Sequence, residues 1–255
     1  MRDPAAQPGG PPDADGLVRL HKLLAQTSVA SRRRCEELMT EGRVEVDGEV
    51  VTRLGAKIDP VHAVVRVDGV RLPPVTAHVY LALNKPRGVV STMSDPEGRP
   101  CLAELVAHRP ERLFHVGRLD TDTDGLLLLT NDGDLAHRLS HPSYEVDKTY
   151  VAEVDGVVRA QTRRRLTDGV PLDDGPVVCS RAVVRASHGD RCIVEVVLHE
   201  GRNRIVRRMF DAVGHPVRRL TRTAVAGVTL GALRPGRLRE LTRTELGPLL
   251  DAAGL

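Results

Sequence analysis

Apolar positions along the chain first recur at helical spacing and later alternate as they do in strands. Residues 1–16 hold almost nothing to bury, so we expect a disordered tail there. Helical spacing occurs over 20–24 and again over 35–39. Ser31 can cap the second of these helices, and Gly42 can end it. The pattern therefore predicts two short helices after the tail.

Short strands are predicted next. Residues 44–50 alternate apolar and polar around an Asp-Gly pair, which is a strong signal for a β-hairpin. Residues 65–69 repeat the strand and the Asp-Gly turn. Two helices followed by short strands predict a small N-terminal module over 17–74. Two consecutive prolines then introduce a linker at 75–77.

The rest of the chain, 78–255, is predicted to form one larger domain. Its apolar runs predict buried strands at 80–83, 126–129, 150–154 and 192–198. Apolar residues at helical spacing predict a helix over 203–213, with Arg204, Arg207 and Arg208 on its other sides. Strands outnumber helices, which favours an α+β fold with a mixed, mainly antiparallel sheet.

Composition describes a globular protein whose charge is unevenly distributed. The chain is 41% hydrophobic and 28% charged, with a net charge of +3, and its length permits a sizeable core. Seven arginines but only two acidic residues lie between 199 and 222. This excess points to an anionic partner such as nucleic acid, although a solvated basic helix face gives the same pattern.

The sequence lacks the features that mark several other classes of protein. The four cysteines are scattered without a C-x-x-C pair, which disfavours a zinc site or a disulfide framework and fits reduced thiols in the cytosol. Neither G-x-G-x-x-G nor G-x-x-x-x-G-K provides a cradle for a nucleotide. No apolar segment has the length of a membrane span, and the N-terminus lacks the apolar region of a signal peptide. We expect a cytoplasmic protein without a nucleotide cofactor.

Candidate chemistry gathers at three aspartates before a buried strand. Asp120, Asp122 and Asp124 precede the apolar run 126–129, and carboxylates set against a core often carry chemistry. The spacing also matches the first half of a calcium loop, but the twelfth position is Asn131 and the second half is apolar. We therefore expect no metal. A glycosidase-type carboxylate pair and a simple turn cap stay open here, whereas no G-x-S-x-G elbow supports a serine hydrolase.

The stretch RLHKLLAQTSVASRRRCEELMTEGRVEVDGEVV joins the helix pair, the basic side chains and the first hairpin. It resembles the S4 RNA-binding domain, and the resemblance covers nearly the whole module. The resemblance implies docking on structured RNA through phosphate contacts, which supply affinity rather than specificity. An exposed basic face on an unrelated small module is the alternative. The residues expected to contact RNA are Arg19, Lys22, Arg32, Arg33, Arg34 and Arg43.

Five motifs follow in order along the larger domain. They are N-K-P-x-G at 84–88, GRLDTDTDGLLLLTNDGDLAHRLSHP from 117, K-x-Y at 148–150, EGRNRIVRRMF at 200–210 and a closing pattern at 227–239. Together with the S4-like module they resemble the RsuA/RluB-type ribosomal branch of the pseudouridine synthases. One departure is Ile205, which stands where family members often carry glutamine. The substitution removes one polar contact near the site but leaves the motif's aspartate in place.

The resemblance implies a reaction and roles for three residues. Uridine in RNA would be isomerised to pseudouridine without a cofactor. Asp120 matches the essential aspartate, which either attacks the ribose C1′ or assists elimination across the sugar. Either role needs an ionised carboxylate in a partly desolvated site, so a nearby cation is required. Arg207 matches the residue that pairs with this aspartate, and Tyr150 matches the tyrosine that packs on the flipped-out base.

The resemblance also implies an RNA partner and further contacts with it. We expect a monomer that acts on ribosomal RNA, favoured to be 23S, or on a ribosomal assembly intermediate. A 16S rRNA enzyme and a non-catalytic ribosome-binding protein with an S4 domain are the alternatives. In the larger domain, the residues expected to contact RNA are Lys85, Arg118, Lys148, Arg202, Arg204 and Arg208. We expect Asp122 and Asp124 to be turn residues.

Overall fold

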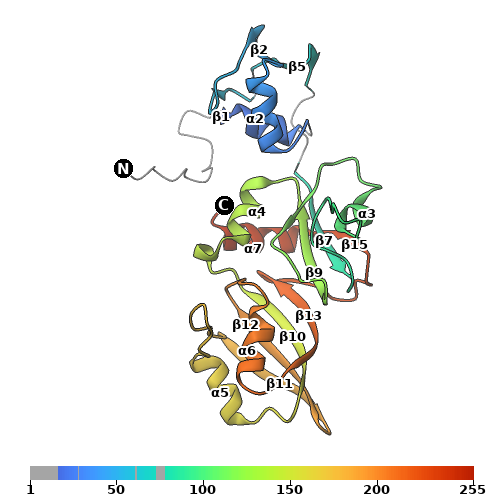
Figure 1. The fold of residues 1–255 in the computed structure, drawn as a ribbon, viewed down its shortest axis with the longest axis vertical. Helices are drawn as coiled ribbons and strands as arrows, with labels where there is room; N and C mark the ends of the chain where they lie inside the picture. The colour runs from blue at the N-terminus through green and yellow to red at the C-terminus, as the bar shows by residue number, and fades with distance from the viewer. Residues whose placement is uncertain (1–16, 28, 61, 73–77) are drawn as a thin grey trace. The chain divides into compact units, whose positions relative to one another are not determined.

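The chain forms two compact units, and the boundary between them falls between His78 and Val79 (Figure 1). The structure is a computed structural model that describes residues 17–27, 29–60, 62–72 and 78–255. The tail predicted at 1–16 and the linker predicted at 75–77 lie outside the described residues. The two units are considered one at a time.

The N-terminal unit contains the predicted helix pair, α1 (Leu20–Gln26) and α2 (Arg32–Thr40). The Ser31 side chain accepts a hydrogen bond from the Arg34 N–H at 3.2 Å and so caps α2 as predicted. The short strands are β1 (Val18–Arg19), β2 (Val44–Val46), β3 (Glu49–Val50), β4 (Lys57–Ile58), β5 (Val65–Val67) and β6 (Val70–Arg71). The apolar sides of both helices pack with Val44, Ile58 and Val65 to form the core of this unit.

Both predicted hairpins are present in this unit. Strands β2 and β3 are joined by Asp47-Gly48, and β5 and β6 by Asp68-Gly69. All four turn residues have a positive φ, between 52° and 89°. Positive φ at both central residues is what a two-residue hairpin turn needs to match the twist of its strands.

The larger unit is built on one sheet. Its strands are β7 (Tyr80–Lys85), β8 (Phe114–Val116), β9 (Thr123–Thr130), β10 (Lys148–Asp155), β11 (Arg181–His188), β12 (Arg191–Leu198), β13 (Val217–Val225), β14 (Val228–Thr229) and β15 (Leu238–Glu240). Among the described residues these nine strands follow the order β11-β12-β10-β13-β9-β7-β15, with β14 beside β13 and β8 beside β9. Strands β9 and β13 pair in parallel and the other neighbours are antiparallel. The predicted α+β fold with a mixed, mainly antiparallel sheet is confirmed.

Helices cover both faces of β9. The helices of the larger unit are α3 (Leu102–Val106), α4 (Gly133–Ser140), α5 (Ala160–Asp168), α6 (Ile205–Ala212) and α7 (Arg243–Ala253), and a 3₁₀ turn spans Pro142–Tyr144. In Figure 1, α4 and α7 lie beside each other, and α6 lies over the strands β10 to β13. Leu127 and Leu129 pack in one apolar core with residues of α3 and α6, whereas Leu126 and Leu128 pack in another with residues of α4 and α7. Burial on both faces explains the unbroken apolar run.

One predicted boundary needs correction. The strand expected at 80–83 continues to Lys85, because Asn84 and Lys85 pair with Leu126 and Gly125 of β9. The turn after it therefore starts only at Pro86.

Within the described residues, no helix is long and apolar enough to cross a membrane.

Gly125 allows the parallel contact between β9 and β13. It pairs with Arg222, and its φ of +109° lies in the region that favours glycine. A Cβ atom at this position would lie 2.3 Å from the Arg222 carbonyl oxygen. Because the clash would be with backbone, the two strands could not relieve it by a rotamer change. Only glycine permits this spacing.

We expect Gly125→Ala to destabilise the larger unit by at least about 3 kcal/mol, since backbone strain adds to the steric clash. Gly189, in the hairpin between β11 and β12, also has a positive φ of +59° but has open space around its Cα. Gly189→Ala should therefore cost only about 1 kcal/mol. Urea unfolding of both variants measures the difference. Equal losses would show that the close approach at Gly125 is unimportant.

Candidate active site

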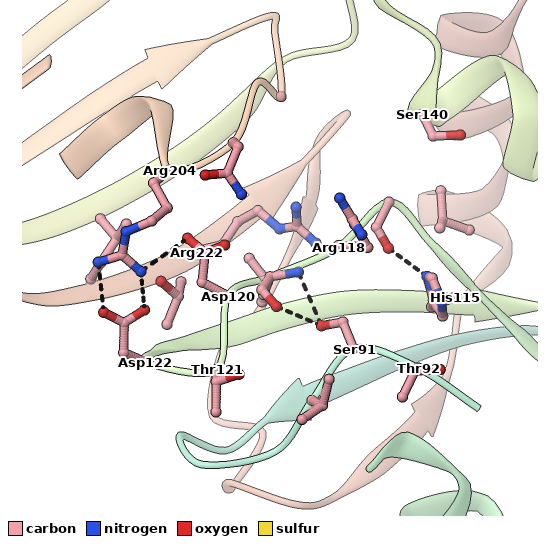
Figure 2. A pocket seen from close by; sticks show the side chains of 18 of the residues that line it. Ser91, Thr92, His115, Arg118, Asp120, Thr121, Asp122, Ser140, Arg204 and Arg222 are labelled. Atoms are coloured by element: carbon pink, nitrogen blue, oxygen red, sulfur yellow. Dashed lines mark hydrogen bonds and ion pairs between the residues drawn. The ribbon is translucent and has the colours of Figure 1, made fainter. Parts of the chain in front are cut away.

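A cavity of about 880 Å³ lies where the loop before β9 meets β10, β13 and the segment leading into α6 (Figure 2). Six residues predicted for the site line it: Arg118, Asp120, Lys148, Tyr150, Arg202 and Arg204. Lys85, Arg207 and Arg208 were also predicted and are not part of its lining. The structure therefore brings together most of the residues that the sequence motifs singled out, although they come from three separate segments.

Asp120 lies in the loop between β8 and β9, and hydrogen bonds fix the backbone on both sides of it. The Ser91 hydroxyl donates to the Leu119 carbonyl at 2.7 Å and accepts from the Leu119 N–H at 3.1 Å. The Asp120 carbonyl accepts from the Thr123 N–H at 3.0 Å and closes a turn. The Asp120 side chain is 31% exposed. A carboxylate is thus held at the cavity wall while remaining open to a ligand.

Asp122 links this loop to the start of α6. Both of its carboxylate oxygens accept hydrogen bonds from Arg204, at 3.1 and 3.0 Å (Figure 2). Arg207 donates to the Asp122 carbonyl at 3.0 Å, and its Nη2 lies 3.3 Å from the carboxylate. Partial burial raises the pKa of Asp122, but the Arg204 hydrogen bonds and the charge of Arg207 outweigh burial and hold the pKa below its ordinary value.

The close contacts of Arg207 are with Asp122, and its pairing with Asp120 stays a prediction. Arg207 is buried in the interior rather than projecting from the helix, and it donates to the carbonyls of Asp122 and Val217. Burial lowers its pKa despite the nearby Asp122. Arg204 is instead the arginine near the candidate aspartate, with its Nη1 4.0 Å from an Asp120 oxygen.

The three aspartates have different environments. Asp124 is a buried residue of β9 rather than the turn residue that was expected. It accepts hydrogen bonds from Thr221 and from Arg219, the latter at 2.9 Å. Because Asp122 and Asp124 are each neutralised by arginines, the three carboxylates do not form a calcium loop. Across the described parts of the chain, no group of three or more His, Cys, Asp and Glu side chains is placed to hold a metal.

Tyr150 and Arg222 face the cavity from neighbouring strands. Tyr150 is buried on β10 and lies directly opposite Arg222 of β13. Arg222 is only 3% exposed, and its Nε donates to the Leu126 carbonyl at 2.8 Å. The sequence pattern did not single out Arg222 as a site residue. It lies in the arginine-rich stretch, and only the alternation of a strand could have distinguished it from its neighbours.

Two lysines predicted to contact RNA are partly or fully buried. Lys85 is fully buried and donates to the Pro86 carbonyl, so its prediction as a phosphate contact is wrong. Burial lowers its pKa to about 8, against the attraction of Asp124 and Asp120. Lys148 lines the cavity and donates to two backbone carbonyls. Burial, and then the charge of Arg222, lower the pKa of Lys148 to about 8.

Other predicted RNA contacts differ in how far they are already neutralised. Arg202 and Arg208 both pair with Asp174, at 2.8 and 2.9 Å, so their charges are partly balanced. Arg118 is exposed at the cavity. Ile205 is buried and contributes an apolar side chain to the cavity wall. Its position is consistent with the loss of a polar contact there.

In the N-terminal unit, the basic residues also fall into two groups. Arg34 pairs with Glu37 and Glu41, and Arg43 pairs with Asp68. The remaining predicted contacts of this unit are Arg19, Arg32 and Arg33, which are exposed, and Lys22, which is half-buried. The exposed residues Arg19, Arg32 and Arg33 are better placed to contact RNA phosphates.

Comparison with known proteins identifies the family. A family model described as RNA pseudouridylate synthase matches residues 79–212, and an S4 domain model matches residues 18–65. The chain belongs to the RNA pseudouridine synthases. This RNA-modifying isomerase is 56% identical over 242 residues to an uncharacterized RNA pseudouridine synthase of Mycobacterium tuberculosis, covering 93% of this chain and 95% of the relative.

Another relative and a solved structure resemble this synthase over most of its length. It is 44% identical over 232 residues to ribosomal large subunit pseudouridine synthase B of Bacillus subtilis, covering 90% of this chain and 94% of the relative. A crystal structure of a pseudouridylate synthase superimposes with a TM-score of 0.62 at 29% identity, covering 91% of this chain and 99% of that one. The predicted family and its S4 domain are confirmed.

Asp122→Asn should lower kcat by roughly 10- to 100-fold, because the neutral amide would hold Arg204 and Arg207 less firmly beside the Asp120 loop. Asp174→Asn is the matched control, since Asp174 also pairs with two arginines but does not line the cavity. Tritium release from [5-³H]uridine-labelled RNA measures both rates. A control that lost as much activity as Asp122→Asn would contradict this role.

Lys148 should give the synthase a pH-dependent affinity for RNA. Its pKa of about 8 means that the ammonium loses its proton, and the cavity one positive charge, as the pH rises through that value. KM for RNA should therefore rise about 3-fold or more between about pH 7 and about pH 9. Lys148→Arg stays charged over this range and should remove that step. If KM showed the same pH dependence in the unsubstituted protein and in Lys148→Arg, Lys148 would not be the source of that dependence.

Proposed function

We propose that this synthase converts a uridine of 23S ribosomal RNA to pseudouridine with Asp120 as its catalytic carboxylate. The choice of RNA is supported by the Bacillus subtilis relative, whose name assigns it to the large ribosomal subunit. We also propose that the enzyme acts as a monomer in the cytoplasm, on the RNA or on an assembly intermediate of the ribosome.

One observation carries the proposed chemistry. The half-buried Asp120 carboxylate lies in the same cavity as the Tyr150 ring and the guanidinium groups of Arg204 and Arg222. A volume of about 880 Å³ is in the range of small-molecule sites and suits a nucleotide rather than a helix. The glycosidic bond is inaccessible in a stacked helix, so the target uridine enters the cavity flipped out.

The reaction needs one glycosidic bond to break and another to form. Asp120, as a carboxylate, either attacks C1′ or removes a ribose proton to assist elimination, and in both routes the N1–C1′ bond breaks. The uracil rotates and C5 bonds to C1′, which breaks the Asp120–C1′ bond in the first route and is followed by return of the ribose proton in the second. N1 takes up a proton, and the C5 proton leaves to solvent. Tyr150 packs on the base during the rotation, and its hydroxyl helps to move that proton. The Arg204 Nη1, 4.0 Å from an Asp120 oxygen, places a cation beside this carboxylate.

Asp120→Asn should abolish pseudouridine formation and leave RNA binding within about 3-fold, because the amide keeps the shape but neither attacks nor accepts a proton. Asp173→Asn, at an exposed site outside the cavity, is the control for loss of one negative charge. Each variant is expressed in a strain lacking the gene, and carbodiimide labelling with primer extension detects pseudouridine. A stop restored by Asp120→Asn would refute the assignment.

The choice of RNA has its own test. Deletion of the gene should remove one or more carbodiimide-dependent stops from 23S rRNA and leave the pattern of 16S rRNA unchanged. Loss confined to 16S rRNA would instead identify a small-subunit enzyme. If the protein bound ribosomes but no stop disappeared from either RNA, it would be the non-catalytic ribosome-binding protein.

A further inference from the structure

Helix α5 presents an unbalanced cluster of positive charge. Arg163, Arg164 and Arg165 lie within it, and Arg159 is its N-cap residue. All four side chains are exposed. Within the described residues, none of the four guanidinium groups has a hydrogen bond or an ion pair with a carboxylate. We call these four residues the α5 arginine cluster.

Arginines on the neighbouring strands are balanced by acidic partners. Arg185 pairs with Glu195 at 2.7 Å, Arg191 pairs with Glu153 at 3.2 Å, and Arg218 pairs with Asp155. Helix α5 packs against β11, so these pairs belong to the same part of the unit. The contrast shows that carboxylates neutralise the strands next to α5 but not α5 itself.

One member of the cluster, Arg159, opposes the stability of the helix. The first turn of α5 contains no acidic residue, and the Arg159 side chain makes no capping hydrogen bond. Positive charge at a helix N-terminus is unfavourable, and the like charges of Arg159 and Arg163 are four residues apart. Leu166 is the one residue of the helix that is buried. Arg165, in the last turn, is favourable for the helix, but folding alone gives no reason for the charge of Arg159.

The cluster is also separate from the site of chemistry. No residue of α5 or β11 lines the cavity that contains Asp120. Figure 1 shows α5 at the part of the larger unit formed by β11 and β12. An anion bound there would touch a part of the RNA other than the flipped uridine.

We propose that the α5 arginine cluster is a second RNA-binding surface, which holds the phosphate backbone of a segment outside the one that carries the target uridine. Guanidinium groups match phosphate oxygens in geometry and stay charged at all physiological pH values. Contacts of this kind carry no sequence information and position the RNA. The proposal rests on RNA as the substrate, and it does not depend on the role of Asp120 or on the choice of 23S rRNA.

The test compares two triple variants of the full chain. The first is Arg163→Gln, Arg164→Gln and Arg165→Gln. The control is Arg234→Gln, Arg237→Gln and Arg243→Gln, which removes three charges that are equally exposed and lie outside both the cavity and α5. Fluorescence anisotropy measures the binding of a labelled RNA hairpin of about 40 nucleotides at several KCl concentrations.

The α5 variant should bind about 10-fold more weakly at low salt, and the slope of log K against log salt should fall by about 2 to 3. The control should change affinity by less than about 3-fold and keep the slope. Replacing the same three α5 residues by lysine keeps the charge, so this variant should retain most of the slope. Melting temperatures of all three variants check that they are folded.

Two results would overturn the proposal. One is an α5 glutamine variant whose affinity and salt slope match those of the control, since the cluster would then be an ordinary solvated surface. The other is unchanged RNA binding combined with loss of binding to phosphatidylglycerol vesicles, which would make the cluster a membrane contact. Because a hairpin without a target uridine serves as the probe, neither result depends on the chemistry proposed for Asp120.

Discussion

The close parallel contact of β9 with β13 at Gly125 is the constraint on which the site depends. Gly125 and Arg222 meet there without room for a Cβ atom. Asp120 lies just before β9, Arg222 lies on β13, and Tyr150 pairs with Arg222 from β10. Segments nearly a hundred residues apart are thereby brought together at one edge of the cavity. The chemistry is assembled by strand pairing rather than by a single motif.

The three aspartates of this region differ in how closely arginines pair with them. Asp122 and Asp124 are each neutralised by arginines and tie β9 to α6 and β13. Asp120 has no such close partner, with Arg204 at 4.0 Å. The result is one carboxylate without a hydrogen-bonded arginine, in a cavity whose other charged walls are mainly basic. A polyanion is attracted to such a cavity.

Local signals in the sequence predicted the elements well, and long-range pairing was harder to predict. The Ser31 cap, the two Asp-Gly hairpins and the buried leucines of β9 each depend on a few neighbouring residues. Arg207 contacts Asp122, which lies in a turn 85 positions earlier along the chain. The spacing of residues within a motif does not predict such a contact. Lys85 looked like a surface residue beside a proline. Its burial follows from pairing with Gly125, which no local pattern shows.

The far edge of the sheet has a consequence for how the molecules behave in a crowded solution. Strand β11 ends the sheet, and its register shifts between Val184 and Ala186. It also carries Arg181 and Arg185, both exposed. A bulged edge that carries long charged side chains is a poor template for another strand, because the shifted register interrupts the ladder and charged side chains resist burial. The edge therefore protects the folded chain against aggregation by sheet extension.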